Sequence, residues 1–168
     1  MSMTKILAVS GVKNSGKTTL IEGLIADLTA RGLRVAVIKH DGHAFEPDRP
    51  GTDTARHLAA GAYGCAVFDG GKYQLVKRVP VSERELMSHF PEADLILLEG
   101  FKNSDWPKVE VVRAGNSAAP VCDPATLVAL VTDVPGLRLP GVPRLDPSDR
   151  AGLTELVWQW MEGGGGLC

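Results

Sequence analysis

A glycine-rich loop near the N-terminus contains the residue types that bind phosphate. Residues 11–18 read GVKNSGKT and match the pattern G-x-x-x-x-G-K-[ST] at every fixed position. Gly11 and Gly16 let the backbone curl, so that successive amide groups from residue 14 to residue 18 point into one concavity at the start of a helix. Lys17 can then reach the β- and γ-phosphates of a nucleotide, and the Thr18 hydroxyl can bind Mg²⁺. This loop predicts a bound nucleoside triphosphate.

The predicted phosphate contacts extend to neighbouring residues. Thr19 is expected near the α-phosphate. Lys13 is a further cation, which either folds over the phosphates, reaches a second subunit or is solvated. The predicted nucleotide-binding residues of the loop are Gly11, Lys13, Asn14, Ser15, Gly16, Lys17, Thr18 and Thr19.

A carboxylate is expected beside the predicted Mg²⁺. Glu99 ends the apolar run LILLE, and ligands of α/β proteins bind beyond the carboxyl ends of parallel strands. Asp94 begins the same run and is expected at the opposite edge of the sheet, so Glu99 is favoured. Asp41, just past the run VAVIK, is the next candidate, as a metal contact through water; a turn or capping role is its alternative. We therefore predict Lys17 and Glu99 as catalytic residues, and Thr18, Glu99 and Asp41 at the metal.

Two further patterns bear on the ligand. Guanine is usually selected by a carboxylate, as in N-K-x-D, and that motif is absent; Asp133, at the end of the run LVTD, could stand in its place. A transition-metal site formed by histidines and acids is an alternative use of the segment after residue 39. Its candidate ligands are His40, Asp41, His43 and Asp48, which no cysteine joins, and His57 is expected to be structural.

The elements that position these residues follow from hydrophobic periodicity. A strand is predicted over residues 6–9, followed by a helix with apolar residues at helical spacing that ends at Gly32, and by a strand over residues 34–39. This βαβ order implies parallel strands with helices packed on the sheet. Further predicted elements are a loop at 40–54, a helix at 54–62, a hairpin of 65–68 and 73–79, a helix from Ser82 to about His89, strands at 94–100, 108–112 and 127–133, and a last helix from about Ser148.

Together these elements predict an α/β protein with the three-layer P-loop NTPase fold. Its sheet is expected to be mostly parallel and flanked by helices, with the β-hairpin as an insertion. A single nucleotide-binding domain is expected over residues 1–162, with a disordered glycine-rich tail at 163–168.

Composition excludes several classes of protein. The 168 residues carry a net charge of -2 and no basic run, so nucleic acid is not expected as a partner. The three cysteines form no CxxC pair, which argues against a zinc ribbon and favours reduced thiols. The short apolar run at the N-terminus fits neither a signal peptide nor a membrane span. A cytoplasmic protein without a membrane partner is expected.

Three stretches together resemble the molybdopterin-guanine dinucleotide biosynthesis protein B family. They are GVKNSGKTTL, VIKHDGHAFEPDRPGTDTARHLAAGA and LLEGFKNSDWPKVEV, and the resemblance covers about residues 5–133. The second and third stretches are more specific than the phosphate loop, because few nucleotide-binding proteins combine IKHDGH with EGFK.

The resemblance implies a dimeric GTP-binding accessory protein with weak hydrolysis. Such a protein assists the molybdenum cofactor guanylyltransferase, which joins GMP to molybdopterin. By position, the family's acids near the phosphates and metal would be Glu99, Asp41, Asp48 and Asp53. Lys102 would face the same nucleotide site and contact phosphate or the pterin. Its alternative is an exposed surface lysine.

The residues themselves also favour slow turnover, because no arginine finger and no glutamine placed to orient water are evident. Two alternative functions are a small-molecule kinase and a metallochaperone GTPase. A small-molecule kinase would need an arginine-rich lid, and residues 41–56 hold only Arg49 and Arg56. A metallochaperone GTPase would need a cysteine motif near the switch loops, and none is present. A homodimer could form through the edge of the hairpin at about residues 65–78.

Overall fold

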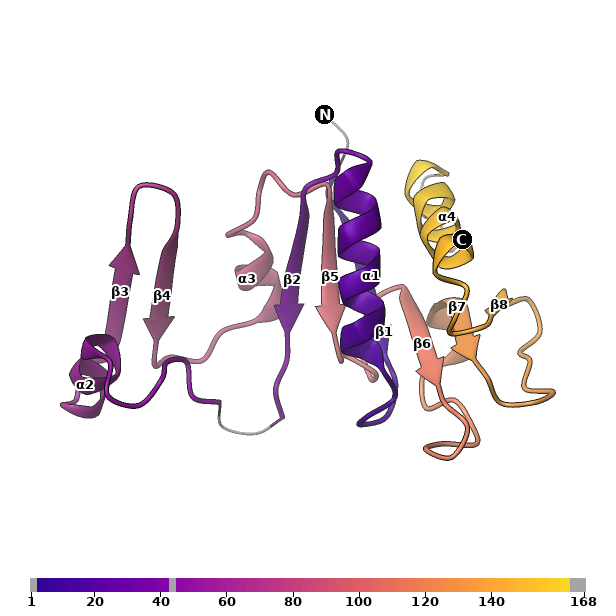
Figure 1. Ribbon diagram of the computed structural model, residues 1–168, viewed down its shortest axis with the longest axis horizontal. Coiled ribbons are helices and arrows are strands. Elements are labelled where there is room, and N and C mark those ends of the chain that lie inside the picture. The colour runs from indigo at the N-terminus through magenta and orange to yellow at the C-terminus, as the bar shows by residue number, and fades with distance from the viewer. Residues whose placement is uncertain (1–2, 43–44, 164–168) are drawn as a thin grey trace. The chain divides into compact units, whose positions relative to one another are not determined.

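The computed structural model describes residues 3–42 and 45–163. The chain forms two compact units: the first runs up to His40 and resumes at Leu86, and the second is Asp41–Glu85. Figure 1 shows the elements of both units.

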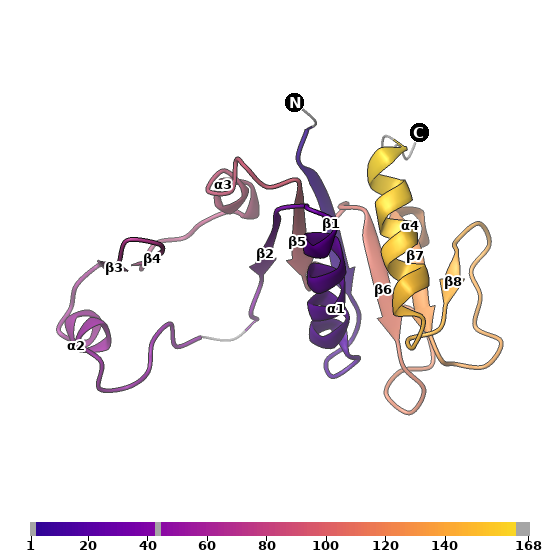
Figure 2. The ribbon, with the colours of Figure 1, turned by 45° about the horizontal axis from the view of Figure 1, so that its top comes forward.

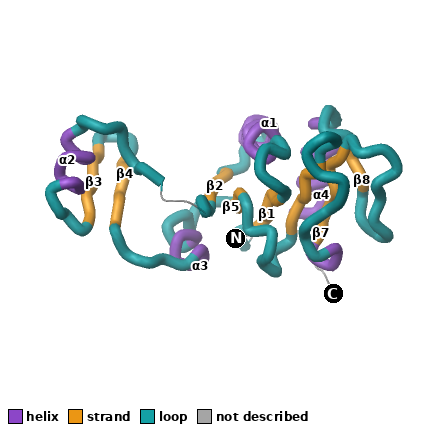
Figure 3. The backbone as a smooth tube through the Cα atoms, turned by 90° about the horizontal axis from the view of Figure 1, so that it is seen from below, coloured by secondary structure: helices purple, strands orange, loops and turns teal. Residues whose placement is uncertain are grey.

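The first unit is built on one parallel sheet of six strands in the order β2-β5-β1-β6-β7-β8. The strands are β1 (Lys5–Ser10), β2 (Val35–Lys39), β5 (Leu95–Glu99), β6 (Lys108–Val112), β7 (Leu127–Thr132) and β8 (Arg144–Leu145). Because all six run the same way, their carboxyl ends share one edge of the sheet. Figure 3 looks onto this edge, where loops cover the strand ends.

Helices cover both faces of this sheet. Alternate residues of β1 separate the two faces: Leu7 and Val9 belong to a large core cluster, and Ala8 to a smaller one. The large cluster packs under α1 (Lys17–Ala30) and α4 (Arg150–Glu162), which lie side by side over the sheet (Figures 1 and 2). The smaller cluster packs against the last residues of α3 (Glu83–Met87). The predicted α/β fold with a mostly parallel sheet is confirmed.

Some element boundaries differ from the sequence-based expectation. The helix from Ser82 was expected to reach about His89, but α3 ends at Met87, and the amide of His89 donates to the Leu86 carbonyl in a turn. Strand β8 and a 3₁₀ turn, η1 (Pro124–Thr126), were not predicted. Two residues of β8 carry no readable pattern, because only their pairing with β7 makes them a strand.

Two charged side chains are buried in β6. Lys108 is 0% exposed, and its ammonium group donates to the Ser104 carbonyl and the Thr126 hydroxyl. Glu110 is also 0% exposed and accepts from the amides of Val121 and Cys122. These bonds compensate for burial of the charges and tie β6 to the loops on either side of it.

The second unit contains α2 (Asp53–Ala59) and an antiparallel hairpin of β3 (Gly64–Phe68) and β4 (Tyr73–Lys77). The hairpin was predicted, and Asp69 stabilises its turn by accepting from the amides of Gly71 at 2.7 Å and Lys72 at 3.0 Å. Among the described residues, no helix is long and apolar enough to cross a membrane. Residues 164–168, most of the predicted disordered tail, lie outside the described residues.

Candidate functional site

The predicted phosphate loop lies between β1 and α1, at the carboxyl edge of the sheet. Its backbone takes left-handed conformations at Asn14, with φ 61°, and at Gly16, with φ 92°. Gly11 has φ 141°, and a Cβ atom there would lie 2.5 Å from the Val111 carbonyl oxygen. The loop therefore packs against β6 so closely that its first glycine has no room for a side chain.

Lys17 extends back over the loop that precedes it. Its ammonium group donates to the Val12 carbonyl at 2.7 Å and to the Gly11 carbonyl at 3.3 Å. The pKa of Lys17 is lowered overall, and burial is the largest cause. The Glu99 carboxylate opposes this shift, whereas the Lys39 and Lys102 ammonium groups add to it. Several cationic groups thus gather around one carboxylate, which is an arrangement suited to a polyanionic ligand.

Glu99 and Thr18 meet at the mouth of the loop. Register places Glu99 beside Val9 of β1 on one side and beside Lys39 of β2 on the other. The Thr18 hydroxyl donates to Glu99 Oε1 at 2.9 Å, and Lys39 Nζ lies 3.9 Å from the same oxygen. Asp94 precedes β5 and therefore lies at the opposite edge, where it accepts from the Arg34 amide at 2.7 Å.

Asp133 follows β7, as predicted, but its carboxylate is engaged on both oxygens. Oδ1 accepts from the Ala114 amide at 2.6 Å, and Oδ2 accepts from Arg113 Nε at 3.0 Å. The Ala114 amide is the main reason that the pKa of Asp133 is lowered. The acid therefore holds the side chain of Arg113, a residue that sequence reasoning did not single out.

Arg113 lies close to the phosphate loop. Its Nη1 atom is 4.0 Å from the position that a Cβ atom would take at Gly16. Asn116, also missed, donates from its side-chain amide to the Lys13 carbonyl at 2.9 Å. The signal that could have found both residues is their position just beyond a strand that ends at the carboxyl edge of the sheet.

The predicted histidine and acid ligands are divided between the two units, and His40 lies in the first unit, where its ring centre is 5.8 Å from that of Phe101. Asp41 and Asp48 lie in the second unit, and the role of Asp41 at a metal stays a prediction. His43 lies outside the described residues, and His57 lies on α2. Over residues 3–42 and 45–163, no group of three or more histidines, cysteines or acids could hold a metal ion.

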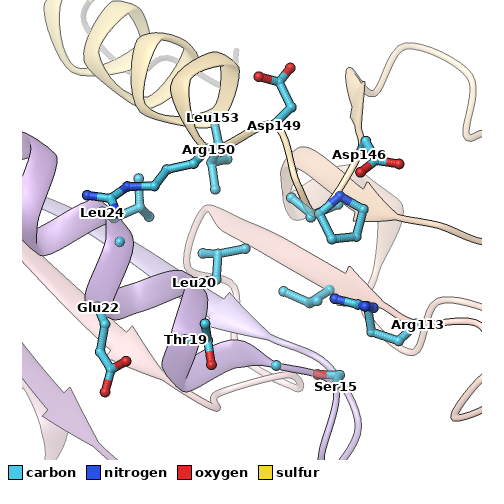
Figure 4. A pocket seen from close by; sticks show the side chains of 15 residues that line it. Ser15, Thr19, Leu20, Glu22, Leu24, Arg113, Asp146, Asp149, Arg150 and Leu153 are labelled. Atoms are coloured by element: carbon cyan, nitrogen blue, oxygen red, sulfur yellow. The ribbon is translucent and has the colours of Figure 1, made fainter.

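A cavity of about 430 Å³ adjoins the phosphate loop, between α1 and the start of α4 (Figure 4). The loop residues Ser15 and Gly16 line it, as do Arg113 and Asp146, and Asp133 does not. Apolar side chains from α1, β6, β7 and α4 also line it: Leu20, Leu24, Val111, Val131 and Leu153. Charged residues of α1 and the start of α4 contribute to the lining as well: Glu22, Asp149 and Arg150.

Comparison with known sequences gives one consistent family. A sequence model described as molybdopterin guanine dinucleotide synthesis protein B matches residues 6–133. The molybdopterin-guanine dinucleotide biosynthesis adapter protein of Escherichia coli strain K12 is 36% identical over 171 residues, covering 96% of this chain and 95% of that protein. A probable adapter protein of the same name from Bacillus subtilis strain 168 is 40% identical over 111 residues, covering 64% of each.

Solved structures agree with these sequences. The crystal structure of Bacillus subtilis MobB matches with a TM-score of 0.78 and 31% identity, covering 92% of this chain and 96% of that one. A MobB homolog from Bacillus stearothermophilus matches with a TM-score of 0.72 and 25% identity, covering 94% and 98%.

Proposed function

Because this chain belongs to the molybdopterin guanine dinucleotide synthesis protein B family, we propose that it is a GTP-binding adapter of molybdenum cofactor biosynthesis. In this role it assists the guanylyltransferase that attaches GMP to molybdopterin. The relatives named above carry the word adapter in their names, which favours this function over a small-molecule kinase or a metallochaperone.

The observation that carries the proposed nucleotide role is the contact between Thr18 and Glu99 at the end of the phosphate loop. A hydroxyl and a carboxylate oxygen 2.9 Å apart are the hard oxygen donors that Mg²⁺ prefers, and Mg²⁺ usually takes only one or two such protein ligands. The residues present therefore fit this ion. Thr18 and Glu99 would hold it, directly or through water, and bound Mg²⁺ would neutralise charge on the β- and γ-phosphates.

The chain's own residues bind the phosphates in this proposal. Lys17 supplies a cation that the Gly11 and Val12 carbonyls hold over the loop, and the amides at the start of α1 supply hydrogen-bond donors. Slow hydrolysis is part of this proposal, because the single glutamine of the first unit, Gln159, donates to Glu155 on α4 and does not orient water at the loop.

Calorimetric titration tests the nucleotide role. GTP, ATP and their non-hydrolysable analogues are titrated with Mg²⁺ into the natural chain and into Lys17→Ala. We expect GTP to bind more tightly than ATP, and Lys17→Ala to lose binding by about a hundredfold, since a charge-assisted contact is removed. Arg34→Ala removes an exposed cation at the far edge of the sheet and is the matched control. Preference for ATP, or equal binding by Lys17→Ala, would contradict the proposal.

The adapter role needs a separate measurement. The natural chain, loaded with GTP, is mixed with a molybdenum cofactor guanylyltransferase, and complex formation is followed by size-exclusion chromatography. We expect a complex, and a faster attachment of GMP to molybdopterin when the adapter is present. An unchanged rate at saturating adapter would reject this role.

A homodimer is also part of the proposal. Pairing in the hairpin puts Ala66 opposite Leu75 and Phe68 opposite Tyr73, so these four side chains share one face. Phe68 is 82% exposed and Tyr73 is 71% exposed, and a second copy would cover this apolar face. Light scattering should give a dimer mass at micromolar concentration. Phe68→Ser with Leu75→Ser should shift it toward the monomer. Tyr63→Ser should not, because Tyr63 pairs with Arg78 just before β3 and alternates onto the opposite face.

The same proposal places the protein in the cytoplasm. Cys65 and Cys122 are both free thiols, which fits a reducing compartment.

A further inference from the structure

We propose that the cavity between α1 and α4 receives the nucleoside of the nucleotide whose phosphates the loop binds, and that Asp146 selects guanine there. This assignment rests on the proposed nucleotide role of the loop and adds to it the residues that choose the base.

The cavity lies where the nucleoside must go. It shares Ser15, Gly16 and Thr19 with the loop and the first turn of α1, so a ligand anchored by its phosphates extends directly into it (Figure 4). Val111 and Val131, near the carboxyl ends of β6 and β7, form its floor. A volume of about 430 Å³ falls within the range of small-molecule sites, which are apolar with a few polar groups.

Ser15 gives the cavity an unused polar group. Its side chain is 1% exposed, and among the described residues its hydroxyl oxygen has no hydrogen-bond partner. A buried hydroxyl without a partner costs free energy, so native structures rarely keep one without a reason. The hydroxyl lies inside the loop, 2.8 Å from the position that a Cβ atom would take at Gly11, so it gains a partner from a ligand only if the loop adjusts on binding.

Arg113 occupies the boundary between the loop and the cavity. Asp133 accepts from its Nε at 3.0 Å, which fixes the guanidinium plane, and its Nη1 reaches toward Gly16. A fixed guanidinium can stack on the face of a purine or contact a phosphate oxygen. In this arrangement Asp133 is a positioning residue that acts through Arg113, and a different acid must contact the base.

Three acids line the cavity: Glu22, Asp146 and Asp149. The exposed Glu22 points away from its interior (Figure 4), and Asp149 caps α4, so we assign the contact with the base to Asp146. Asp146 directly follows β8. Its Oδ1 accepts from the Ser148 amide at 2.8 Å and the Ser148 hydroxyl at 2.6 Å, whereas Oδ2 accepts from no described residue. The bonds from Ser148 lower the pKa of Asp146, so the carboxylate stays ionised and can only accept.

Acceptor-only chemistry distinguishes the purines. Guanine offers two adjacent donors on one edge, N1–H and the C2 amino group, and both complement a carboxylate. Adenine has an acceptor at N1 and no amino group at C2, so the same edge is repelled. Xanthine replaces the C2 amino group by a carbonyl, which an ionised Asp146 also repels. An amide at this position should favour xanthine instead, because its N–H can donate to that carbonyl.

The test compares Asp146→Asn with Asp149→Asn. Asp149 stands three residues later, caps α4 by accepting from the Gly152 amide at 2.9 Å, and asparagine keeps that acceptor. Both variants lose one negative charge at the same rim. Calorimetry measures GTP, XTP, ATP and inorganic tripolyphosphate, each with Mg²⁺, against the natural full chain and both variants; Lys17→Ala is titrated with tripolyphosphate.

We expect Asp146→Asn to weaken GTP about tenfold or more and to raise the affinity for XTP relative to GTP, with tripolyphosphate unchanged. Asp149→Asn should keep the natural ratio of GTP to XTP affinity. An unaltered ratio of GTP to XTP affinity in Asp146→Asn, or a reversed ratio in Asp149→Asn, would overturn the assignment of Asp146.

Tripolyphosphate tests the loop separately. If it binds the natural chain and binds Lys17→Ala more weakly, the proposed role of the loop stands whatever the base contact is. If it does not bind the natural chain, or binds both chains equally, the proposed role of the loop is overturned.

Discussion

Thr18 and Glu99 are 81 residues apart in sequence, yet their side-chain oxygens lie 2.9 Å apart. The contact joins the first turn of α1 to the end of β5. In the proposed role, Thr18 and Glu99 would hold Mg²⁺, and their existing contact would reduce the cost of ordering the site when nucleotide binds.

Substitution of Thr18 tests this proposed role. Thr18→Ala removes the hydroxyl, so we expect it to lose most of the gain in GTP affinity that Mg²⁺ gives, about tenfold. Thr18→Ser keeps the hydroxyl and should keep the gain. Titrations with Mg²⁺ and with a chelator give the two affinities. If Thr18→Ala retained the natural ratio between them, the metal would not be held by this residue.

The close approach of Gly11 to β6 gives a second prediction. Gly11→Ala brings Cβ to 2.5 Å from the Val111 carbonyl oxygen at φ 141°, so we expect it to lower the free energy of unfolding by about 3 kcal/mol. Gly32→Ala has φ 91° but nothing within 4 Å, and should cost only about 1 kcal/mol. Urea denaturation measures both. Equal losses would mean that the contact with Val111 contributes nothing.

At the residue scale, the sequence predicted where site residues lie in the sheet better than it predicted their hydrogen-bond partners. The strand-end rule placed Glu99 at the carboxyl edge because β5 is a short, continuous apolar run. The same rule placed Asp133 at the end of β7, but it did not predict the bonds to Arg113 and Ala114, two residues that follow the neighbouring strand β6. Side-chain pairing across strands depends on sheet order, and one sequence carries no direct signal for that order.

At the scale of elements, α1 and α4 are joined by polar contacts at the surface of the sheet. Arg150 Nε donates to Asp27 Oδ2 at 2.7 Å, and the Thr154 hydroxyl donates to the same oxygen at 2.9 Å. Arg31 bonds Glu155 at 3.2 Å and lies 5.2 Å from the centre of the Trp158 ring. These contacts hold together the two helices that form opposite walls of the cavity.

Acid should loosen this junction. The bond from Arg150 is the main cause that lowers the pKa of Asp27 below its ordinary 3.8. At a pH between the pKa of Asp27 in the folded chain and its pKa in the unfolded chain, the unfolded chain binds more protons. The free energy of unfolding therefore rises with pH in this range. The contribution of Asp27 is thus complete above pH 3.8 and is lost as pH falls through the lowered pKa. Denaturation at pH 6 and in steps below pH 4 should show this slope.

Asp27→Asn is the variant that isolates the effect. It should be less stable than the natural chain at pH 6 and should lose less stability on acidification. Asp105→Asn, which removes a carboxylate elsewhere on the surface, should follow the natural curve. A parallel pH dependence for Asp27→Asn and the natural chain would show that this ion pair does not contribute.

Most elements could be predicted because their signals are local. Apolar residues of α1 recur at helical spacing, and the turn residues Asp69, Gly70 and Gly71 between two apolar runs predict the hairpin. Strand β8 and the order β2-β5-β1-β6-β7-β8 could not be predicted in this way. Both arise from pairing between distant segments, and β8 is only two residues long. The cavity beside the loop depends on the same pairing, since the segment after β8 supplies its rim.

At the scale of the whole molecule, the two units differ in how they are stabilised. The described core clusters belong to the first unit, where β1, β5, β6 and β7 contribute buried side chains from both faces. In the second unit, four of the five residues of β4 are exposed. A two-stranded hairpin of this kind is marginally stable alone.

Hydrogen exchange should report this difference. We expect the amides of β1, β5, β6 and β7 to exchange slowest, and those of β3 and β4 much faster at low protein concentration. If a second copy covers the hairpin, its protection should increase as concentration rises, while protection of the sheet should not. Mass spectrometry of peptic fragments resolves the two sets. Hairpin exchange that is slow at every concentration would contradict the dimer as its source of stability.

The buried environment of Cys122 has a practical consequence for chemical labelling. Burial and the nearby Glu110 carboxylate raise the pKa of this thiol to about 12, so it is almost entirely protonated at neutral pH. Maleimides react with the thiolate, and Cys122 is only 7% exposed, whereas Cys65 on β3 is half-buried. In a Cys168→Ser chain a dye therefore goes to Cys65. The hairpin thus receives a single fluorophore, and Cys122 need not be removed. When copies that carry a donor dye are mixed with copies that carry an acceptor dye, energy transfer between them reports dimer formation.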